Sequence, residues 1–275
     1  MHKLAATISG QGRFKDAEEM ILQIIRLEEK VLGKDHPLTL DGIHILAMTV
    51  GDLGRYGEAE ALYRQTLQLR KMLLGTDHPN ILSTMGNMAW TLGKLAGLGD
   101  HTKFQEVEAL YRQTIQLGGK VLGEEHVETL DSMHGLARVL GEQAKLGGHT
   151  KFKEAEDLLR QVLQLQEKLL GSEDLKTLIT MHNLGWMLGE WSLLGQHTKY
   201  KEAEELFQRI IELREKLLGK EHEETLRNMA CLDSLQHRQR MREASLQKGK
   251  TPRRETDSIS TDGGRAYKRR KIEPV

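Results

Sequence analysis

The sequence predicts an all-α solenoid built from about five helix pairs. Two short phrases recur along the chain, and the residues between them alternate between apolar and polar with a helical period. One phrase, LGTDHP at residues 74–79, returns in variant form at intervals of 42, 48, 48 and 48 residues. Self-similarity at a fixed period of roughly 20–50 residues indicates stacked repeats, because one such unit cannot bury its apolar face alone.

The second phrase marks the second helix of each pair. It has five copies, among them GRYGEAEAL (54–62) and TKYKEAEEL (198–206). In the last copy, apolar residues three or four positions apart form one face of a helix; they are Tyr200, Ala203, Leu206, Phe207, Ile210, Ile211, Leu213 and Leu217. In the LGTDHP phrase, Gly is favoured just after a helix and Pro at the first helical position. The phrase therefore separates one pair from the next.

The connection between the two helices of a repeat is six residues longer in each of the last three repeats than in the first full repeat. VGDLGRY (50–56) becomes, for example, MLGEWSLLGQHTKY (187–200). Six helical residues would add about 9 Å to a helix, but glycines near the end of each insertion indicate that part of it is loop.

Both ends of the array depart from the pattern. Aligning Phe14 with Tyr56 places Met1 in the middle of a first helix, so we expect a truncated first repeat that an upstream domain or another chain covers. Residues 227–245 keep the register but are more polar, which is typical of the capping helix that a solenoid end needs. Residues 246–275 have little to bury and are expected to form a disordered basic tail.

Charge and composition bound the class of protein. The formal net charge is zero, but residues 246–275 carry nine Lys and Arg against four Asp and Glu, leaving 31 and 36 for residues 1–245. The single cysteine, Cys231, excludes an internal disulfide and favours a reducing compartment. Because the chain has no run of 18 apolar residues, no membrane span is predicted. We expect a cytoplasmic protein.

The tail holds two basic clusters, KGKTPRRE (248–255) and YKRRKIEPV (267–275). Such a pair is typical of a nuclear-import signal, and basic runs also bind nucleic acid through counterion release. A solvated charged end is the other interpretation. Tyr267 is the one aromatic residue between the charges, so specific nucleic-acid recognition is not expected. An import signal would use Lys248, Lys250, Arg253, Arg254, Lys268, Arg269, Arg270 and Lys271.

The stretch LAMTVGDLGRYGEAEALYRQTLQLRKMLLGTDHPNIL (46–82) resembles a tetratricopeptide repeat of the kinesin-light-chain type, as also found in fungal NACHT and NB-ARC receptor-like proteins. The resemblance covers residues 1–226, and it implies a right-handed α-solenoid without catalytic activity. The protein would then be a scaffold that binds a peptide or a partner helix. The alternative is the detached sensing or assembly arm of a receptor.

The resemblance also implies that the first helices line a concave groove. Positions just before the Leu-Ala pair of each first helix, and two after its Leu, would point inward. They are His44, Ile45, Asn87, Trp90, His134, Arg138, His182, Asn183 and Trp186. Asn can both donate to and accept from a peptide backbone, and Trp offers a broad, stiff contact surface. For Trp90 and Trp186 the alternative is a place in the core between helices.

Twelve histidines raise the possibility of a metal enzyme. Eleven of them fall in three columns that follow the repeat. Neighbouring helix axes are about 8–10 Å apart, whereas zinc needs nitrogens at about 2.0–2.1 Å, so one column cannot converge on one ion. The chain also has no GxSxG, P-loop, HExxH or CxxC motif. We therefore predict no cofactor, no metal and no catalysis; a metal-dependent enzyme is the least favoured alternative.

Overall fold

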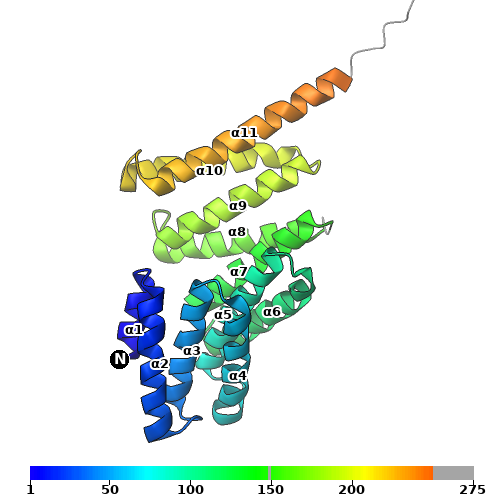
Figure 1. The fold of residues 1–275 in the computed structure, drawn as a ribbon. Coiled ribbons are helices and arrows are strands. Elements are labelled where there is room, and N and C mark those ends of the chain that lie inside the picture. Colours follow the sequence, from blue (N-terminus) through cyan, green and yellow to red (C-terminus); the bar gives the residue numbers. More distant parts are fainter. Residues whose placement is uncertain (148–149, 250–275) are drawn as a thin grey trace, which may run out of the picture. The chain divides into compact units, whose positions relative to one another are not determined.

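The computed structural model of the 275-residue chain describes residues 1–147 and 150–249, and the regular secondary structure of these residues is entirely helical, without a strand (Figure 1). The elements are α1 (His2–Gly10), α2 (Phe14–Leu32), α3 (Pro37–Asp52), α4 (Tyr56–Leu74), α5 (Pro79–Gly97), the 3-10 turn η1 (His101–Lys103), α6 (Phe104–Val121), α7 (Val127–Lys145), α8 (Lys151–Leu170), α9 (Leu175–Leu193), α10 (Thr198–Leu218) and α11 (Glu223–Gly249). Met1–Gln236 form one compact unit, and a second begins at His237, within α11.

Ten of these helices form five pairs, from α1 with α2 to α9 with α10, and each helix packs against the next along the chain. First helices also contact first helices of neighbouring pairs, α3 with α5, α5 with α7 and α7 with α9. The predicted solenoid of five helix pairs is therefore confirmed. The first pair has the short first helix that the sequence predicts, with nine residues in α1 against 16 in α3.

First and second helices differ in how much of their surface is buried. In α4 the buried residues lie on one face, for example Ala59, Tyr63 and Leu67. In α5, by contrast, buried residues occur on nearly every side; they are Ile81, Leu82, Thr84, Met85, Met88, Ala89, Thr91, Leu92, Gly93 and Ala96. A first helix contacts the helices before and after it and also its counterparts in adjacent repeats, which explains its small and apolar residues.

The six additional residues of the later repeats are divided between helix and connection. The first helices α5, α7 and α9 each have 19 residues, three more than α3. The remaining residues lengthen the segment before the second helix, where η1 forms after α5. The prediction that part of the insertion is loop is confirmed.

The recurring LGTDHP phrase is a complete helix-to-helix turn. Gly75 ends α4 with φ +79°, a left-handed conformation that strains residues with a Cβ. His78 then caps α5, because its Nδ1 accepts a hydrogen bond from the Asn80 N–H at 3.1 Å. Equivalent caps are made by His36, His126 and His222. The histidines of this column therefore cap helices. Their period indicated a structural role, but the sequence did not predict the cap itself.

Loss of the His78 cap should destabilise the array moderately. We expect His78→Ala to lower the free energy of unfolding by about 1 kcal/mol, because the N–H of Asn80 loses its acceptor. His78→Asp should retain most of the stability, since Asp174 makes the equivalent cap at 2.9 Å before α9. Urea unfolding of the three proteins measures this difference. Equal losses for Ala and Asp would show that the cap does not contribute.

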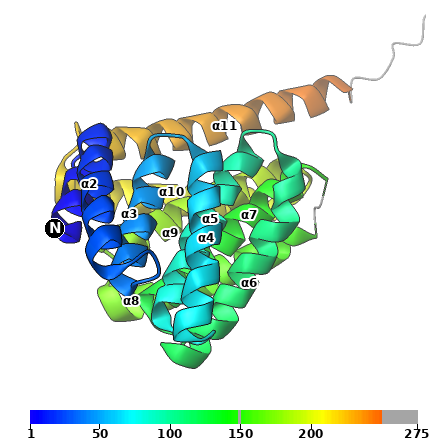
Figure 2. The same ribbon diagram turned by 60° about the horizontal axis from the view of Figure 1, so that its bottom comes forward.

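Ion pairs connect the second helices of consecutive repeats, which follow one another across the view as α2, α4 and α6 in Figure 2. Glu60 of α4 accepts from Arg64 one turn later and from Lys103 of the next repeat, at 2.8 and 2.9 Å. Burial raises the pKa of Glu60, but the hydrogen bonds from Lys103 and Arg64 outweigh it and hold the pKa below its usual range. The same arrangement recurs around Glu108 and Glu156.

The C-terminal helix α11 is longer than predicted. It begins at Glu223, after the His222 cap, and continues to Gly249. The predicted capping helix, residues 227–245, is its central part, and residues 246–249 are helical although we expected the tail to start there. The helix continues because no glycine or proline interrupts it before Gly249. Residues 250–275, with most of the predicted import signal, lie outside the described residues, as does the side chain of Lys248.

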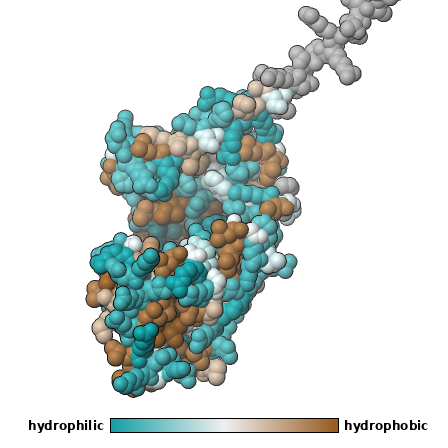
Figure 3. Space-filling model, viewed as in Figure 1, coloured by the Kyte–Doolittle hydropathy of each residue, from teal (hydrophilic) through white to brown (hydrophobic). Residues whose placement is uncertain are grey.

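Exposed apolar side chains are spread along the array and gather over the region of α3 to α5 in Figure 3. Met48 of α3 and Trp90 of α5 are both exposed, at 43% and 38%. In the ranges that the structure describes, no helix combines the length and the apolar character needed to span a membrane.

Candidate functional site

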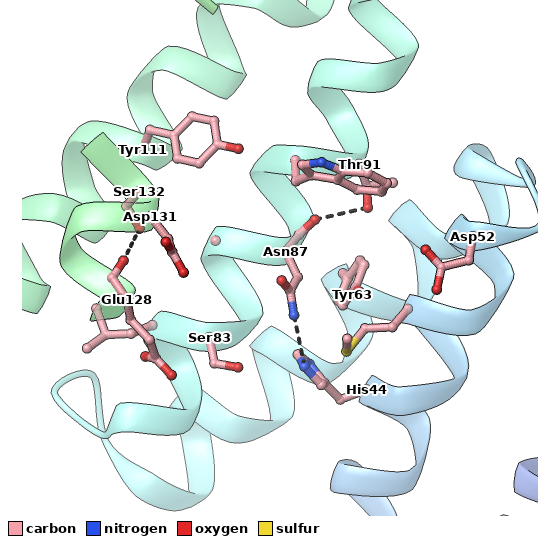
Figure 4. Close-up of a pocket in the computed structure, with 14 residues that line it drawn as sticks. His44, Asp52, Tyr63, Ser83, Asn87, Thr91, Tyr111, Glu128, Asp131 and Ser132 are labelled. Carbon is pink, nitrogen blue, oxygen red and sulfur yellow. Dashed lines mark hydrogen bonds between the residues drawn. The ribbon is translucent and has the colours of Figure 1, made fainter. Parts of the chain in front are cut away.

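A pocket of about 530 Å³, here called pocket 1, lies between the first helices α3, α5 and α7 (Figure 4). Three residues of the predicted groove line it: His44, Asn87 and Trp90. The other lining residues are Met48, Asp52, Tyr63, Leu82, Ser83, Gly86, Thr91, Tyr111, Glu128, Asp131 and Ser132. Most of them come from first helices, whereas Tyr63 and Tyr111 come from second helices.

A second hollow of about 230 Å³, pocket 2, lies between α7 and α9. It is lined by five further residues of the predicted groove, His134, Arg138, His182, Asn183 and Trp186, together with Ala137, Gly141, Glu142, Leu159 and Met187. Eight of the nine predicted residues thus line one of two neighbouring pockets. Ile45 lines neither pocket, since its half-buried side chain packs against the hydrophobic core.

Histidine–asparagine pairs connect first helices of adjacent repeats. Asn87 Nδ2 lies 3.2 Å from His44 Nε2, and Asn183 Nδ2 lies 2.6 Å from His134 Nε2. The amide nitrogen donates, so each imidazole accepts at Nε2. Each Asn therefore already uses one N–H within the protein. Its carbonyl oxygen and second N–H make no other hydrogen bond among the described residues, so they could bind a ligand.

Glycines replace this pair where α5 meets α7. Gly86 of α5 occupies the repeat position that is histidine in α3, α7 and α9, namely His44, His134 and His182. Gly135 of α7 occupies the next position, which is Asn87 in α5 and Asn183 in α9. A Cβ at Gly135 would lie 2.4 Å from Cζ of Tyr111, so that position needs glycine. A Cβ at Gly86 would meet nothing closer than the Ser132 hydroxyl at 3.9 Å. The junction is left open there, and pocket 1 occupies the space.

The three groove histidines are held in the neutral form. Burial lowers the pKa of His44 to about 4, and the nearby positive charge of Arg70 contributes. Burial likewise lowers the pKa of His134, with Arg138 adding to the effect, and that of His182. The histidines therefore add no positive charge to the pockets at neutral pH.

The two predicted groove tryptophans have different environments. Trp90 is 38% exposed, with the ring of Tyr56 edge-on at 6.3 Å and Lys94 Nζ at 5.0 Å from its centroid. Trp186 is half-buried against the core and also lines pocket 2, where Lys145 Nζ lies 3.7 Å from its ring centroid. Trp90 therefore lines a pocket with part of its ring exposed, whereas Trp186 lines a pocket and also packs against the core.

Sequence reasoning missed the three acidic residues of pocket 1, Asp52, Glu128 and Asp131. They lie outside the inward-facing columns, at the end of α3 and in the first turns of α7. Within the described ranges, no three His, Cys, Asp or Glu side chains are placed to hold a metal ion.

Stacked helix pairs whose first helices line successive pockets define a helical-repeat interaction scaffold. Tetratricopeptide repeat profiles match the sequence, one at residues 1–71 and 43–100 and another at 150–175 and 193–224. Together they cover more than half of the chain. The protein belongs to the tetratricopeptide repeat family.

Similar solved structures support this assignment. Two are crystal structures of a Podosopora anserina protein described as a kinesin light chain with nearly identical TPR-like repeats. The first, a variant, has a TM-score of 0.60 and 28% identity over 78% of this chain and 93% of that one. The second has a TM-score of 0.59 and 27% identity, and the match covers 79% of this chain and 94% of that one. BtubC (BKLC) from P. vanneervenii is similar in fold, with a TM-score of 0.55 and 18% identity. The match covers 92% of this chain and 98% of that one.

The resemblance to kinesin-light-chain-type repeats is thereby confirmed. The interpretation as a receptor arm stays a prediction. None of the curated proteins matches the sequence.

Proposed function

We propose that this protein is a non-enzymatic scaffold that binds a peptide or a partner helix in the groove formed by pockets 1 and 2. The observation that carries the proposal is the convergence of Asn, Trp and Arg side chains from consecutive first helices on two adjacent pockets. Ligand sites are typically apolar hollows with a few polar groups that fix orientation.

The rigidity of the groove supports the same function. Histidine–asparagine pairs hold α3 to α5 and α7 to α9, so the polar groups are in position before a ligand arrives. A preformed site avoids most of the entropic cost of ordering side chains on binding. Trp90 is the side chain best placed to act as an anchor, because it is both exposed and at the pocket wall.

The test is selection of random peptides, displayed on phage, against the full-length protein, followed by calorimetric measurement of Kd for the enriched sequences. We expect the double variant Trp90→Ala/Trp186→Ala to weaken binding about tenfold or more, as for hot-spot residues. Leu98→Ala is the control, since this exposed leucine at the end of α5 lines neither pocket. The proposal fails if no peptide is enriched or if the double variant binds as well as the control.

A further inference from the structure

We propose that pocket 1 binds the side chain of a lysine or arginine in the partner peptide. This inference rests on the proposed function and specifies the chemistry of the ligand. The occupant follows from the charge and the apolar wall of the pocket.

Pocket 1 is lined by three carboxylates and by no lysine or arginine. Figure 4 shows Glu128 and Asp131 on α7 at one side and Asp52 on α3 at the other, with Ser83 and Asn87 between them. The one histidine of the lining, His44, is neutral near pH 7 because burial lowers its pKa to about 4. The lining residues of the pocket therefore carry a net negative charge.

Two of these carboxylates have no ion-pair partner in the part of the chain that the structure describes. Within the described residues, the one polar contact of the Asp52 carboxylate is with the Ser9 hydroxyl, which donates to it at 3.4 Å. Glu128 is engaged through its backbone alone. Asp131 does pair with Lys176, at 2.9 Å. All three carboxylates are exposed, and together they give the pocket rim its negative charge.

His44 is the buried side chain that holds Asn87 in position at the pocket. The side chain is 8% exposed and lines the pocket, with its ring directed toward Asn87 in Figure 4. Its Nε2 accepts from Asn87, so its Nδ1 carries the proton, and this donor has no partner in the described structure.

The apolar part of the lining suits the alkyl stem of a long basic side chain. Met48, Leu82 and Trp90 offer such a wall, and Lys and Arg bury their methylenes along apolar surface while the charged group reaches polar partners. Lys94 already places its ammonium near the Trp90 ring. The incoming cation therefore depends mainly on the carboxylates, and Trp90 contacts the stem.

Pocket 2 differs in charge, which should fix where the basic residue binds. One cation and one carboxylate line it, Arg138 and Glu142, and Lys145 both pairs with Glu142 at 3.3 Å and lies over Trp186. A second cation is disfavoured there. The peptide should consequently carry its basic residue at one defined position.

Two variants of the full-length protein test the proposal with the peptides selected above. Asp52→Asn/Glu128→Gln removes the charge at nearly constant shape. Gly86→His installs the residue that α3, α7 and α9 carry at this position, and the space around Gly86 admits its Cβ, so the imidazole should fill the pocket. Gly57→Ala in α4 is the matched control, because it also replaces a helical glycine, in open space away from the pocket.

We expect the selected peptides to share one Lys or Arg, and its replacement by norleucine to weaken binding about tenfold. Asp52→Asn/Glu128→Gln should cause a similar loss that is not additive with the norleucine peptide. Gly86→His should abolish binding, and Gly57→Ala should leave Kd unchanged. The inference is overturned, with the proposed function intact, if groove-dependent peptides have an acidic or apolar anchor or tolerate norleucine. If no peptide depends on the groove, both proposals fail.

Discussion

Replacing Arg70 by alanine should lower the free energy of unfolding by about 3 kcal/mol, because the side chain joins three helices. Arg70 of α4 is only 3% exposed. Its guanidinium donates to the Asn80 carbonyl at 3.0 Å and the Thr84 hydroxyl at 2.6 Å, both on α5, and to Asp41 of α3 at 2.5 Å. The truncation removes these charged hydrogen bonds, leaves the carbonyl of Asn80 without this donor, and opens a cavity.

Arg70→Gln is the informative control for this prediction. The equivalent position two repeats later is Gln166, which is also buried, so the fold tolerates an amide there. We expect Gln to cost less than Ala in urea unfolding, because the amide fills more of the space and can still donate. If alanine costs less than about 1 kcal/mol, the connection through Arg70 is not important for stability.

Acidification from about pH 7 to about pH 4.5 should destabilise the protein, with His44 contributing about 2.5 kcal/mol. Burial and Arg70 lower its pKa in the folded state from 6.5 to about 4. Between these values the unfolded state binds more protons than the folded state, so the stability that neutral His44 contributes is lost as pH falls. His134 and His182, whose pKa values are also lowered by burial, act in the same direction.

The effect of His44 can be separated from that of the carboxylates. The pKa of Glu60 is held below its usual range, so its contribution is lost only below about pH 4.5. His44→Gln keeps an acceptor for Asn87 and should reduce the loss between pH 7 and pH 4.5. His101→Gln, at an exposed position, should leave the loss unchanged. The same pH dependence in all three proteins would contradict the assignment.

The repeat pattern indicated which residues of the first helices lie together, but not which hydrogen bonds they make. The sequence identified Asn87 and His44 as inward-facing, and both line pocket 1. It did not indicate that they bond each other, since that contact depends on the register between α3 and α5. The turn histidines were likewise located by their period, whereas their capping role depends on a hydrogen bond within the first turn, as at His78. Ile45 was placed in the groove by its column but packs into the core.

The sequence by itself determined the helix pairs, their order and the turns between them. These features depend on local signals, such as the apolar period of α10 and the left-handed glycine at Gly75, which each repeat carries in full. The tertiary structure alone decided the shape and charge of pocket 1. That pocket exists because Gly86 has no side chain, and its carboxylates come from different repeats, Asp52 from α3 and Glu128 from α7. Residues so far apart in the chain meet only when repeats stack, and no single repeat encodes the distance between them.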